Sequence, residues 1–433
     1  METLPQKIKK HEAKVVVIGI GYVGLPLCVE MAGAGFHTTG YDRDAGKVER
    51  VNASKSYVKD VADDTLAPLV ASGKLKASTD PSVLRDADVV VICVPTPLNK
   101  TKEPDNSFIM LAAEDVKAAM HKDMLVILES TTFPGFTREL LLPKLAESGL
   151  QVGRDYFLCF SPERVDPGNA KWHTKNTPKV VGGVTPNCLE MIQALYGEVL
   201  ERLVPVSSTD VAEMVKLLEN TFRAVNIALV NEVAVMCHKL DLDTWEVLDA
   251  AATKPFGFMR FSPGPGLGGH CIPIDPLYLS WKLKTLKYEA RFIELANDIN
   301  AHMPDHAVEK VVDALNAQKK ALNGSRVLVL GVAYKKDIDD VRESPALDVI
   351  GLMQDKGADV AYHDPHVPTI TLRGRRMESR PLDAIGDYDC VAVITEHSSV
   401  DYLDVAKRAR SVVDTRNALA AVRGDLRAKI VML

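Results

Sequence analysis

The chain has 433 residues, enough for about three domains of ~150 residues each. Its hydrophobic content of 46% and charged content of 25% are typical of globular proteins, and the formal net charge of -6 without a basic block disfavours a nucleic-acid partner. No apolar run reaches ~18 residues, so we expect no membrane-spanning helix, and the charged residues 1–14 lack an apolar signal core. The seven cysteines are scattered without a CxxC pair, which predicts no zinc site, no disulfide framework and a reducing, cytoplasmic location.

The first third of the chain carries a dinucleotide-binding pattern. A β-branched run at 14–18 predicts a buried parallel strand, and Gly19-Ile20-Gly21-Tyr22-Val23-Gly24 follows at once. A helix is expected over 25–35 and a second strand over 36–41, after which comes Asp42. In such a unit the first glycine permits a tight turn, the second lets a pyrophosphate approach the backbone, and the third lets helix and strand pack closely. The helix N-terminus then faces the phosphates.

The acidic residue after the second expected strand indicates which dinucleotide binds. Asp42 can accept hydrogen bonds from ribose hydroxyls and would repel a 2′-phosphate, so NAD is favoured over NADP, although the neighbouring Arg43 leaves NADP open. Further buried strands are expected at 87–94 and 124–128, and Pro95, Thr96 and Thr131 follow them. Because the carboxyl ends of parallel strands line the ligand crevice, Thr96 and Thr131 are candidates for contacts to cofactor or substrate. Capping of the next helix is an equal alternative.

The middle of the chain predicts one long helix. Residues 209–240 contain neither Gly nor Pro and would span roughly 48 Å at ~1.5 Å per residue. Apolar residues lie on nearly every face, which is typical of a buried helix, and we expect it to form a dimer core. Lys216 and Asn220 share one face, where an ammonium and an amide could stabilise an oxyanion or simply form a solvated stripe. Glu163, after an expected strand at 156–160, could carry a proton or be a solvated loop acid.

A glycine- and proline-rich loop ends at a single thiol. Its sequence is Pro263-Gly264-Pro265-Gly266-Leu267-Gly268-Gly269-His270-Cys271. Such a backbone can bring main chain close to a ligand. A thiolate can add to an aldehyde, and the adduct can give up a hydride. On its own Cys271 would be interpreted as a small buried hydrophobe, but beside a dinucleotide site it predicts an oxidation that proceeds through a thioester.

The last third predicts a second α/β unit. Strands are expected at 326–330, 358–362, 390–395 and 411–415, with a helix around 345–355, and the alternation indicates a second parallel sheet. The unit begins at Gly331 but lacks the full GxGxxG pattern. Lys335, Arg342 and Arg416 suit a phosphate-bearing ligand, while a surface ion pair with Glu343 is the alternative for Arg342.

Seven motifs in order along the chain resemble the UDP-glucose/GDP-mannose dehydrogenase family. They are VVVIGIGYVGLPL from Val15, CVPTP from Cys93, ESTTFPG from Glu129, SPERVDPGN from Ser161, EMVKLLENTFRAVNIALVNE from Glu213, GPGLGGHCIPIDP from Gly264 and VAYKKDIDDVRESPA from Val332. Within the family, SPERVDPGN and GGHCIPIDP are most similar to UDP-N-acetyl-D-glucosamine 6-dehydrogenases. Ile274 and Pro255 stand where UDP-glucose enzymes carry a basic residue and an arginine.

The resemblance implies a fold of two Rossmann-like, doubly wound parallel-sheet domains joined by a helical domain with one long central helix. The implied domains are an NAD-binding domain over 1–205, a central dimerisation domain with the cysteine loop over 206–305, and a UDP-sugar-binding domain over 306–433. The implied reaction is a four-electron oxidation of the C6 hydroxyl of a UDP-sugar to the uronic acid, with two NAD per sugar. UDP-N-acetylglucosamine is the expected substrate, and UDP-N-acetylmannosamine and UDP-glucose are alternatives.

The resemblance also implies roles for individual residues. Cys271 would carry the thiohemiacetal and thioester, Lys216 and Asn220 would hold oxyanions, Asp275 and Thr131 would order water or assist proton transfer, and Glu163 would be a base in hydrolysis. The implied NAD contacts are Gly19, Gly21, Tyr22, Val23, Gly24, Asp42, Arg43, Pro95, Thr96, Thr131 and Arg342. The implied UDP-sugar contacts are Glu163, Arg164, Lys216, Asn220, Gly268, Lys335 and Arg416.

Two other classes of protein share parts of this pattern. A two-electron β-hydroxyacid dehydrogenase would use the NAD unit and a lysine and asparagine on one helix, but it has no use for Cys271 or a second α/β unit. A non-catalytic NAD-binding sensor would bind the cofactor without turnover. The favoured reading is an oxidoreductase that makes a polysaccharide or glycoconjugate precursor.

Overall fold

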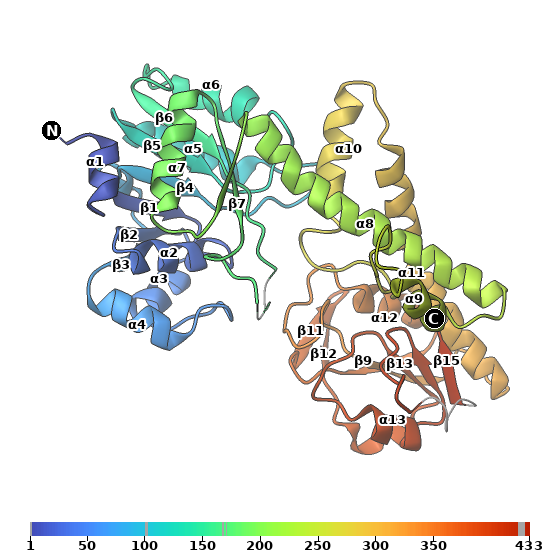
Figure 1. Ribbon diagram of the computed structural model, residues 1–433. Helices are drawn as coiled ribbons and strands as arrows, with labels where there is room; N and C mark the ends of the chain where they lie inside the picture. Colours follow the sequence, from blue (N-terminus) through green and yellow to red (C-terminus); the bar gives the residue numbers. More distant parts are fainter. Residues whose placement is uncertain (1, 100–102, 167–168, 170, 423–428) are drawn as a thin grey trace. The chain divides into compact units, whose positions relative to one another are not determined.

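The computed structural model describes residues 2–99, 103–166, 169, 171–422 and 429–433, and the chain divides into two compact units. The first unit comprises residues 1–219 and 281–287, and the second comprises 220–280 and 288–433. The long helix α8 (Thr209–Lys239) contributes residues to both units (Figure 1). Among the described residues, no helix is both long enough and apolar enough to cross a membrane.

The first unit is built on an eight-stranded sheet in the order β3-β2-β1-β4-β5-β6-β7-β8. The strands are β1 (Lys14–Ile18), β2 (His37–Tyr41), β3 (Leu75–Ser78), β4 (Val89–Ile92), β5 (Met124–Leu128), β6 (Tyr156–Phe160), β7 (Lys179–Gly183) and β8 (Leu203–Val206). The first six run parallel, whereas β7 pairs antiparallel with β6 and β8 runs parallel to β7. The carboxyl ends of β1, β4 and β5 therefore lie at one sheet edge, together with the amino end of β7.

Successive strand residues point to opposite faces of a sheet, so the continuous apolar runs of these strands place apolar side chains on both faces. Helices cover these faces. Val15 and Val17 pack in one core with side chains of α1, α2 and α7 (Figure 1). The alternating Val16 and Ile18 are equally buried and belong to the other face. The helices of the unit are α1 (Leu4–Lys9), α2 (Gly24–Gly33), α3 (Ala45–Asn52), α4 (Asp63–Ala71), α5 (Ser107–Ala119), α6 (Leu142–Ala146) and α7 (Pro186–Gly197), with a 3-10 turn η1 (Pro81–Leu84) and a π-turn η2 (Thr137–Leu141).

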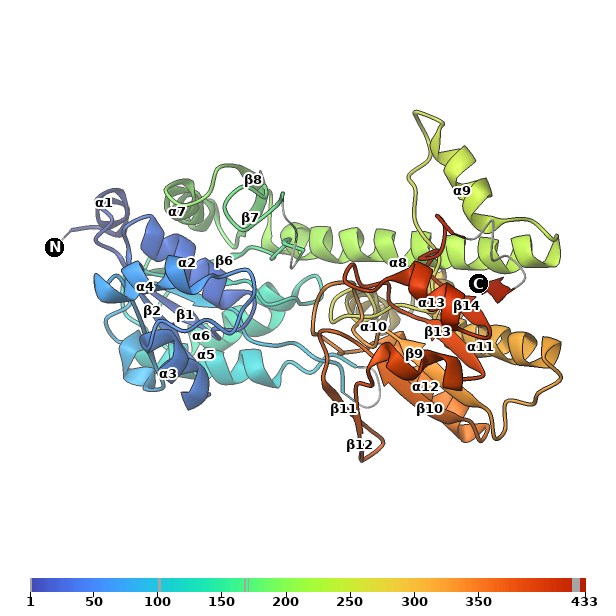
Figure 2. The ribbon, with the colours of Figure 1, turned by 90° about the horizontal axis from the view of Figure 1, so that it is seen from below.

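The second unit contains a five-stranded, all-parallel sheet in the order β10-β9-β13-β14-β15. Val327 and Val329 of β9 face α11 and α12, while Leu328 and Leu330 face α13, so both faces are buried. A two-stranded hairpin, β11 with β12, extends beside the edge strand β10 (Figure 2). The elements are α9 (Thr244–Ala252), α11 (Arg291–Ala317), β9 (Arg326–Leu330), α12 (Pro345–Asp355), β10 (Asp359–His363), β11 (Thr369–Leu372), β12 (Arg375–Glu378), η3 (Leu382–Asp387), β13 (Cys390–Val393), α13 (Tyr402–Arg408), β14 (Val412–Asp414) and β15 (Ile430–Met432). Helix α10 (Asp275–Thr285) begins in this unit, and its residues 281–285 belong to the first unit.

The predicted fold class is confirmed, with a predominantly parallel sheet near each end of the chain and a helical region between them. The expected strands at 14–18, 124–128, 156–160 and 326–330 have the observed bounds. One expectation is wrong in detail, because the first sheet is not parallel throughout: β7 and β8 run against the other strands.

The composition of the long helix α8 predicted that it is buried. Within a single chain, however, one side of α8 is exposed. Leu218 is 56% exposed and Leu229 is 54% exposed, although Leu217 and Val230 beside them are buried. One side of α8 therefore packs in the core, and another side carries apolar residues that reach the surface.

A buried carboxylate organises the carboxyl edge of the second sheet. Asp364, which follows β10, is 2% exposed. It accepts hydrogen bonds from four backbone N–H groups, at Val332 (2.7 Å), Ala333 (3.0 Å), His366 (2.8 Å) and Val367 (3.1 Å). Burial opposes ionisation, but a further bond with His397 and the backbone donors lower the pKa of Asp364 to about 2. This carboxylate fixes the turn after β9, which leads to Lys335.

We predict that Asp364→Asn lowers the free energy of unfolding by roughly 3 kcal/mol at neutral pH, because an amide presents an N–H group where the site offers only donors. Since the folded-state pKa lies below the ordinary value of 3.8, the ionic part of this stabilisation is present above pH 3.8 and is lost as the pH falls toward 2. Urea unfolding across this pH range measures both effects. Asp359→Asn is the matched control, because Asp359 is exposed; equal stability of the two variants would contradict the role of Asp364.

Candidate functional site

The glycine turn of the first unit has the geometry that a dinucleotide site requires. Gly19 has a φ of +88°, and a Cβ there would lie 2.6 Å from the carbonyl oxygen of Cys93. A Cβ on Gly24 would lie 1.9 Å from the carbonyl oxygen of Gly19, so only glycine permits this close approach of α2 to the turn. A Cβ on Gly21 would meet no described atom within 4 Å, which leaves room for a ligand against the backbone.

The carboxylate at the end of β2 is tied to this turn. One oxygen of Asp42 accepts from the Ile20 N–H at 3.0 Å and from Lys47 Nζ at 3.3 Å, and the other accepts from the Asp44 N–H at 2.9 Å. The neighbouring Arg43 donates to Asp115 on α5 at 3.1 Å. The predicted ribose-binding residue and the predicted phosphate-binding turn therefore lie side by side.

The residues that follow β4 and β5 differ in exposure. Pro95 is exposed and Thr96 is buried, while Thr131 is half-buried. Thr132 is 1% exposed, and its hydroxyl oxygen has no hydrogen-bond partner among the described residues. The spacing after β5 does not distinguish Thr131 from Thr132, and only Thr131 was predicted as a candidate.

A buried glutamate of α8 holds the loop that follows these threonines. Glu213 is fully buried and accepts from the Gly135 N–H at 2.6 Å and from the Thr137 N–H at 2.9 Å and hydroxyl at 2.6 Å. Burial raises the pKa of Glu213 to about 7, although these three donors favour the anion. The half-buried Lys216 follows Glu213 by about one helical turn. Glu213 therefore fixes the loop after β5 to the part of α8 that contains Lys216.

The loop after β6 presents a fully bonded carboxylate. Glu163 accepts from the N–H groups of Arg164 (2.6 Å) and Val165 (2.7 Å) and from Lys179 Nζ (3.1 Å). Burial opposes ionisation, but the Lys179 ammonium and these N–H groups lower the pKa of Glu163. The Arg164 guanidinium binds the Glu219 carboxylate at 2.6 Å. The Pro167–Gly168 part of this motif lies outside the described residues.

In the second unit, the start of α10 brings three predicted residues together. Cys271 is half-buried, whereas the other six cysteines are buried. Its carbonyl oxygen accepts from the Asp275 N–H at 2.8 Å, which fixes the backbone of the thiol-bearing residue to the helix start. Asp275 is 2% exposed, and its carboxylate accepts from the buried side-chain amide of Asn220 at 2.5 Å. A thiol, an amide and a carboxylate thus belong to one continuous local structure.

The glycines of the cysteine loop permit close packing on the C-terminal segments. A Cβ on Gly264 would lie 2.4 Å from Arg416, and a Cβ on Gly268 would lie 2.6 Å from the Cβ of Tyr334. The Gly264 N–H donates to Asn231, a buried residue of α8, at 2.9 Å. The loop therefore lies directly against Arg416 and against Tyr334, the residue before Lys335.

Three basic residues predicted to face ligands occupy different settings. Arg416 donates through Nε to the Ile394 carbonyl at 2.9 Å, and burial lowers its pKa. Lys335 is half-buried. Arg342 forms an ion pair with Asp340 at 2.6 Å, and its carbonyl accepts from the Gly269 N–H at 3.1 Å.

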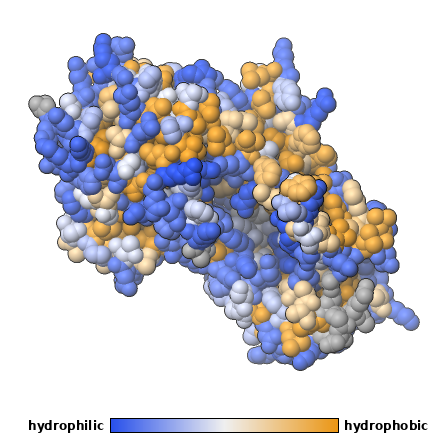
Figure 3. All heavy atoms as spheres, viewed as in Figure 1, coloured by the Kyte–Doolittle hydropathy of each residue, from blue (hydrophilic) through white to orange (hydrophobic). Residues whose placement is uncertain are grey.

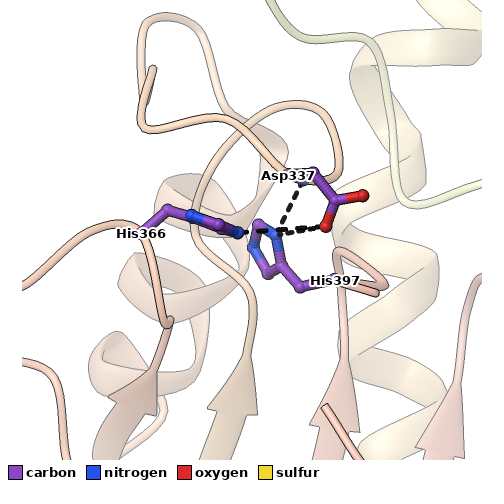
Figure 4. Close-up of side chains that lie close together, drawn as sticks. All are labelled: Asp337, His366 and His397. Atoms are coloured by element: carbon purple, nitrogen blue, oxygen red, sulfur yellow. Dashed lines mark hydrogen bonds and ion pairs between the residues drawn. The ribbon is translucent and has the colours of Figure 1, made fainter. Parts of the chain in front are cut away.

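A separate cluster in the second unit consists of Asp337, His366 and His397 (Figure 4). Their ligand atoms lie within 4.8 Å of one another, and Nε2 of His366 has no hydrogen-bond partner among the described residues. Both nitrogens of His397 are already engaged, since Nδ1 accepts from the Asp337 N–H at 3.0 Å and Nε2 faces Asp364 at 3.0 Å. A metal ion would have to displace the first of these bonds, so the arrangement favours a structural role.

Comparison with known proteins covers almost the whole chain. Three models of the UDP-glucose/GDP-mannose dehydrogenase family match: the NAD-binding domain at residues 13–200, the central domain at 210–302 and the UDP-binding domain at 328–421. These segments contain the glycine turn, the cysteine loop and Lys335, respectively.

Individual relatives agree with these matches. The chain is 34% identical over 358 residues to UDP-N-acetyl-D-glucosamine 6-dehydrogenase of Pseudomonas aeruginosa, which covers 82% of this chain and 83% of that protein. It is 33% identical over 414 residues to UDP-N-acetyl-D-mannosamine dehydrogenase of Pyrococcus horikoshii, covering 94% of this chain and 96% of that protein. A solved structure of the Pyrococcus horikoshii UDP-D-ManNAc dehydrogenase matches with a TM-score of 0.86 at 32% identity, over 94% of this chain and 96% of that one. The chain therefore belongs to the UDP-glucose/GDP-mannose dehydrogenase family.

Proposed function

We propose that this chain catalyses the NAD-dependent four-electron oxidation of the C6 hydroxyl of a UDP-sugar to the uronic acid. The observation that supports this most directly is the local structure of Cys271, Asp275 and Asn220, whose loop packs on Arg416 and on the segment of Lys335. The work would be divided among an NAD-binding domain over 1–205, a central domain over 206–305 and a UDP-sugar-binding domain over 306–433.

Cys271 is the nucleophile in this proposal. NAD supplies the hydride acceptor for each of the two oxidation steps. After the C6 alcohol has become an aldehyde, the Cys271 thiolate adds to its carbon and forms a thiohemiacetal. Loss of a second hydride leaves a thioester, and water then releases the carboxylate and restores the thiol. Two NADH form for each sugar because the alcohol-to-acid conversion removes four electrons.

Other side chains would support the charges that develop. The Asn220 amide has two hydrogens, of which Asp275 accepts one, so the other can donate to the oxyanion on C6. Lys216 would add a positive charge from the same helix. Glu163 would act in hydrolysis as an ionised group, because its contacts lower its pKa and keep it deprotonated at neutral pH. Thr131 would help to order the water.

The substituent at C2 of the sugar is the open specificity question. The relatives act, by their names, on UDP-N-acetylglucosamine and on UDP-N-acetylmannosamine. We favour UDP-N-acetylglucosamine because the motifs around Glu163 and Cys271 are most similar to those enzymes. Pro255 and Ile274 stand in place of basic residues and disfavour UDP-glucose.

Counting NADH per sugar tests the reaction class. With UDP-N-acetylglucosamine as limiting substrate, we expect two NADH for each sugar and the uronic acid as product, followed by absorbance and by mass spectrometry of the nucleotide sugar. UDP-N-acetylmannosamine and UDP-glucose serve as parallel substrates. One NADH with an aldehyde product would instead indicate a two-electron dehydrogenase, and cofactor binding without turnover would indicate a sensor.

Cys271→Ser should reduce the rate of acid formation by roughly 10³-fold or more, because a serine hydroxyl is not ionised near neutral pH as a thiol can be. NAD binding should stay unchanged in fluorescence titration, because the glycine turn lies in the other compact unit. Cys237→Ser, which alters a buried cysteine of the same unit, is the control for structural damage. Acid formation at the normal rate by Cys271→Ser would exclude the covalent route.

Asp42→Ala should weaken NAD binding by roughly 10-fold and narrow the preference for NAD over NADP, because a ribose acceptor and a repulsive charge are lost together. The ratio of kcat/KM for the two cofactors measures the effect. Asp64→Ala, at an exposed aspartate of α4 in the same unit, is the matched control and should leave the NAD affinity unchanged. An unaltered ratio in Asp42→Ala would show that Asp42 does not read the ribose.

We further propose a homodimer formed through α8. Phe222, Leu229 and Met236 are 46%, 54% and 47% exposed and recur every seventh residue, so they form one apolar stripe. Figure 3 shows apolar atoms at the surface where the end of α8 lies in Figure 1. An exposed apolar stripe of this kind is typical of a surface that a partner covers.

Leu229→Glu should shift the mass measured by light scattering from dimer to monomer, because it places a charge in the centre of this stripe. Leu403→Glu is the control, since Leu403 is similarly exposed at 41% but lies on α13. A dimer that persists equally in both variants would place the interface elsewhere.

A further inference from the structure

A buried lysine connects two carboxylates at the carboxyl edge of the first sheet. Lys179 is the first residue of β7, and its side chain is 4% exposed. Its Nζ donates to Glu129 at 3.0 Å and to Glu163 at 3.1 Å. Glu129 follows β5 directly and precedes the loop of Thr131, so the lysine lies between two segments that the proposed reaction uses.

The reversal of strand direction at β7 brings this lysine to the site. In the antiparallel pairing of β6 with β7, Phe160 lies opposite Gly182. Continued by three residues, this register sets Glu163 opposite Lys179, and the hydroxyl of Ser161 donates to the Val180 carbonyl at 2.8 Å along the way. A parallel β7 would have placed its first residue at the other end of the sheet.

The second carboxylate holds the ammonium in place. Glu129 is 2% exposed, and its other oxygen accepts a hydrogen bond from the hydroxyl of Tyr196 on α7. The Lys179 ammonium also lies 6.0 Å from the centre of the Tyr196 ring. The Lys179–Glu129 ion pair is therefore supported by further polar and aromatic contacts, as a buried ion pair requires.

We propose that Lys179 is a positioning residue, whose ammonium fixes the Glu163 carboxylate at the carboxyl edge of the first sheet while Glu129 anchors the ammonium. This inference rests on the proposed function, because it assigns Glu163 a task in the hydrolysis step. Lys179 itself contacts neither substrate nor cofactor in this account; it acts through Glu163.

The charges around Glu163 determine the direction of each effect. Lys179, Glu129 and Glu163 form a trio of charged groups. Tyr196 on α7 and Cys93 after β4 face this trio, while the Arg164 guanidinium faces Glu219 on α8. Burial opposes the charge on every member, yet the pKa of Lys179 is raised by the two carboxylates and the pKa of Glu163 is lowered. The pKa of Glu129 is raised, by burial and by the nearby Glu163.

Two variants should move the pH dependence of acid formation in opposite directions. Lys179→Met removes the cation, so the acid-side inflection of kcat should shift to higher pH by roughly one unit or more. Glu129→Gln removes the competing carboxylate, so the inflection should shift to lower pH. Glutamine fits there, since its oxygen can accept from Lys179 and its amide can donate to the Tyr196 hydroxyl. In both variants the KM for NAD should stay the same.

Lys179→Arg should restore most of the wild-type profile, because it keeps a cation between the carboxylates. Opposite shifts cannot come from general structural damage, and if Lys179→Met does not fold, the downward shift in Glu129→Gln decides the matter. Shifts in the same direction, or none, in variants that still form uronic acid would overturn the proposal for Lys179. A wild-type protein that forms no acid from any UDP-sugar would instead overturn the proposed function.

Discussion

The buried hydrogen bond from Asn220 to Asp275 is the interaction on which the rest of the site depends. It ties α8 to the first residue of α10, and the N–H of Asp275 in turn holds the carbonyl of Cys271. A thiol at the end of a glycine-rich loop would otherwise sample many positions, because glycine restricts the backbone so little. Here the hydrogen bond from the helix start fixes the backbone of Cys271, so the thiol proposed as the nucleophile extends from a defined point.

Glycine serves two opposite purposes in this protein. In the cysteine loop, Arg416 occupies the space where a side chain of residue 264 would lie, and Tyr334 occupies that of residue 268. The absence of side chains at Gly264 and Gly268 therefore permits contact between protein segments. At Gly21 of the first unit the space remains open, which suits a ligand that approaches the backbone. The same residue type therefore builds the support of one site and the binding surface of another.

Buried charges organise both sheet edges at the ends where ligands are expected. In the second unit, Asp364 gathers backbone donors and fixes the turn that leads to Lys335. In the first unit, Lys179 joins Glu129 to Glu163. Such groups are costly to bury unless they are bonded, so their several hydrogen bonds indicate rigid edges instead of adaptable ones. A rigid edge suits the proposed reaction, in which one sugar must be held through two oxidations.

Local sequence patterns predicted much of this architecture. The β-branched runs at 14–18 and 326–330 predicted strands with the observed bounds, because a strand buried on both faces needs a continuous apolar run. The glycine turn followed by Asp42 was also predicted from short-range spacing. The family match then confirmed the fold class and the dehydrogenase family.

What the sequence did not reveal depends on long-range pairing. Nothing local indicates that β7 runs antiparallel to β6, and so Lys179 could not be placed beside Glu163. No local pattern around Glu213 indicates that it holds Gly135 and Thr137, which lie in a loop more than 70 residues earlier. The ion pair of Arg342 with Asp340 was missed for a different reason: the adjacent Glu343 was the simpler partner to expect.

The central claim is that a sugar is bound covalently to Cys271 during turnover, and mass spectrometry of the acid-quenched protein tests it most directly. During steady-state turnover with UDP-N-acetylglucosamine and NAD, we expect a fraction of the protein to gain the mass of the oxidised nucleotide sugar, with the adduct on the peptide that contains Cys271. Free aldehyde released into solution, with no adduct at that peptide at any time point, would contradict the account.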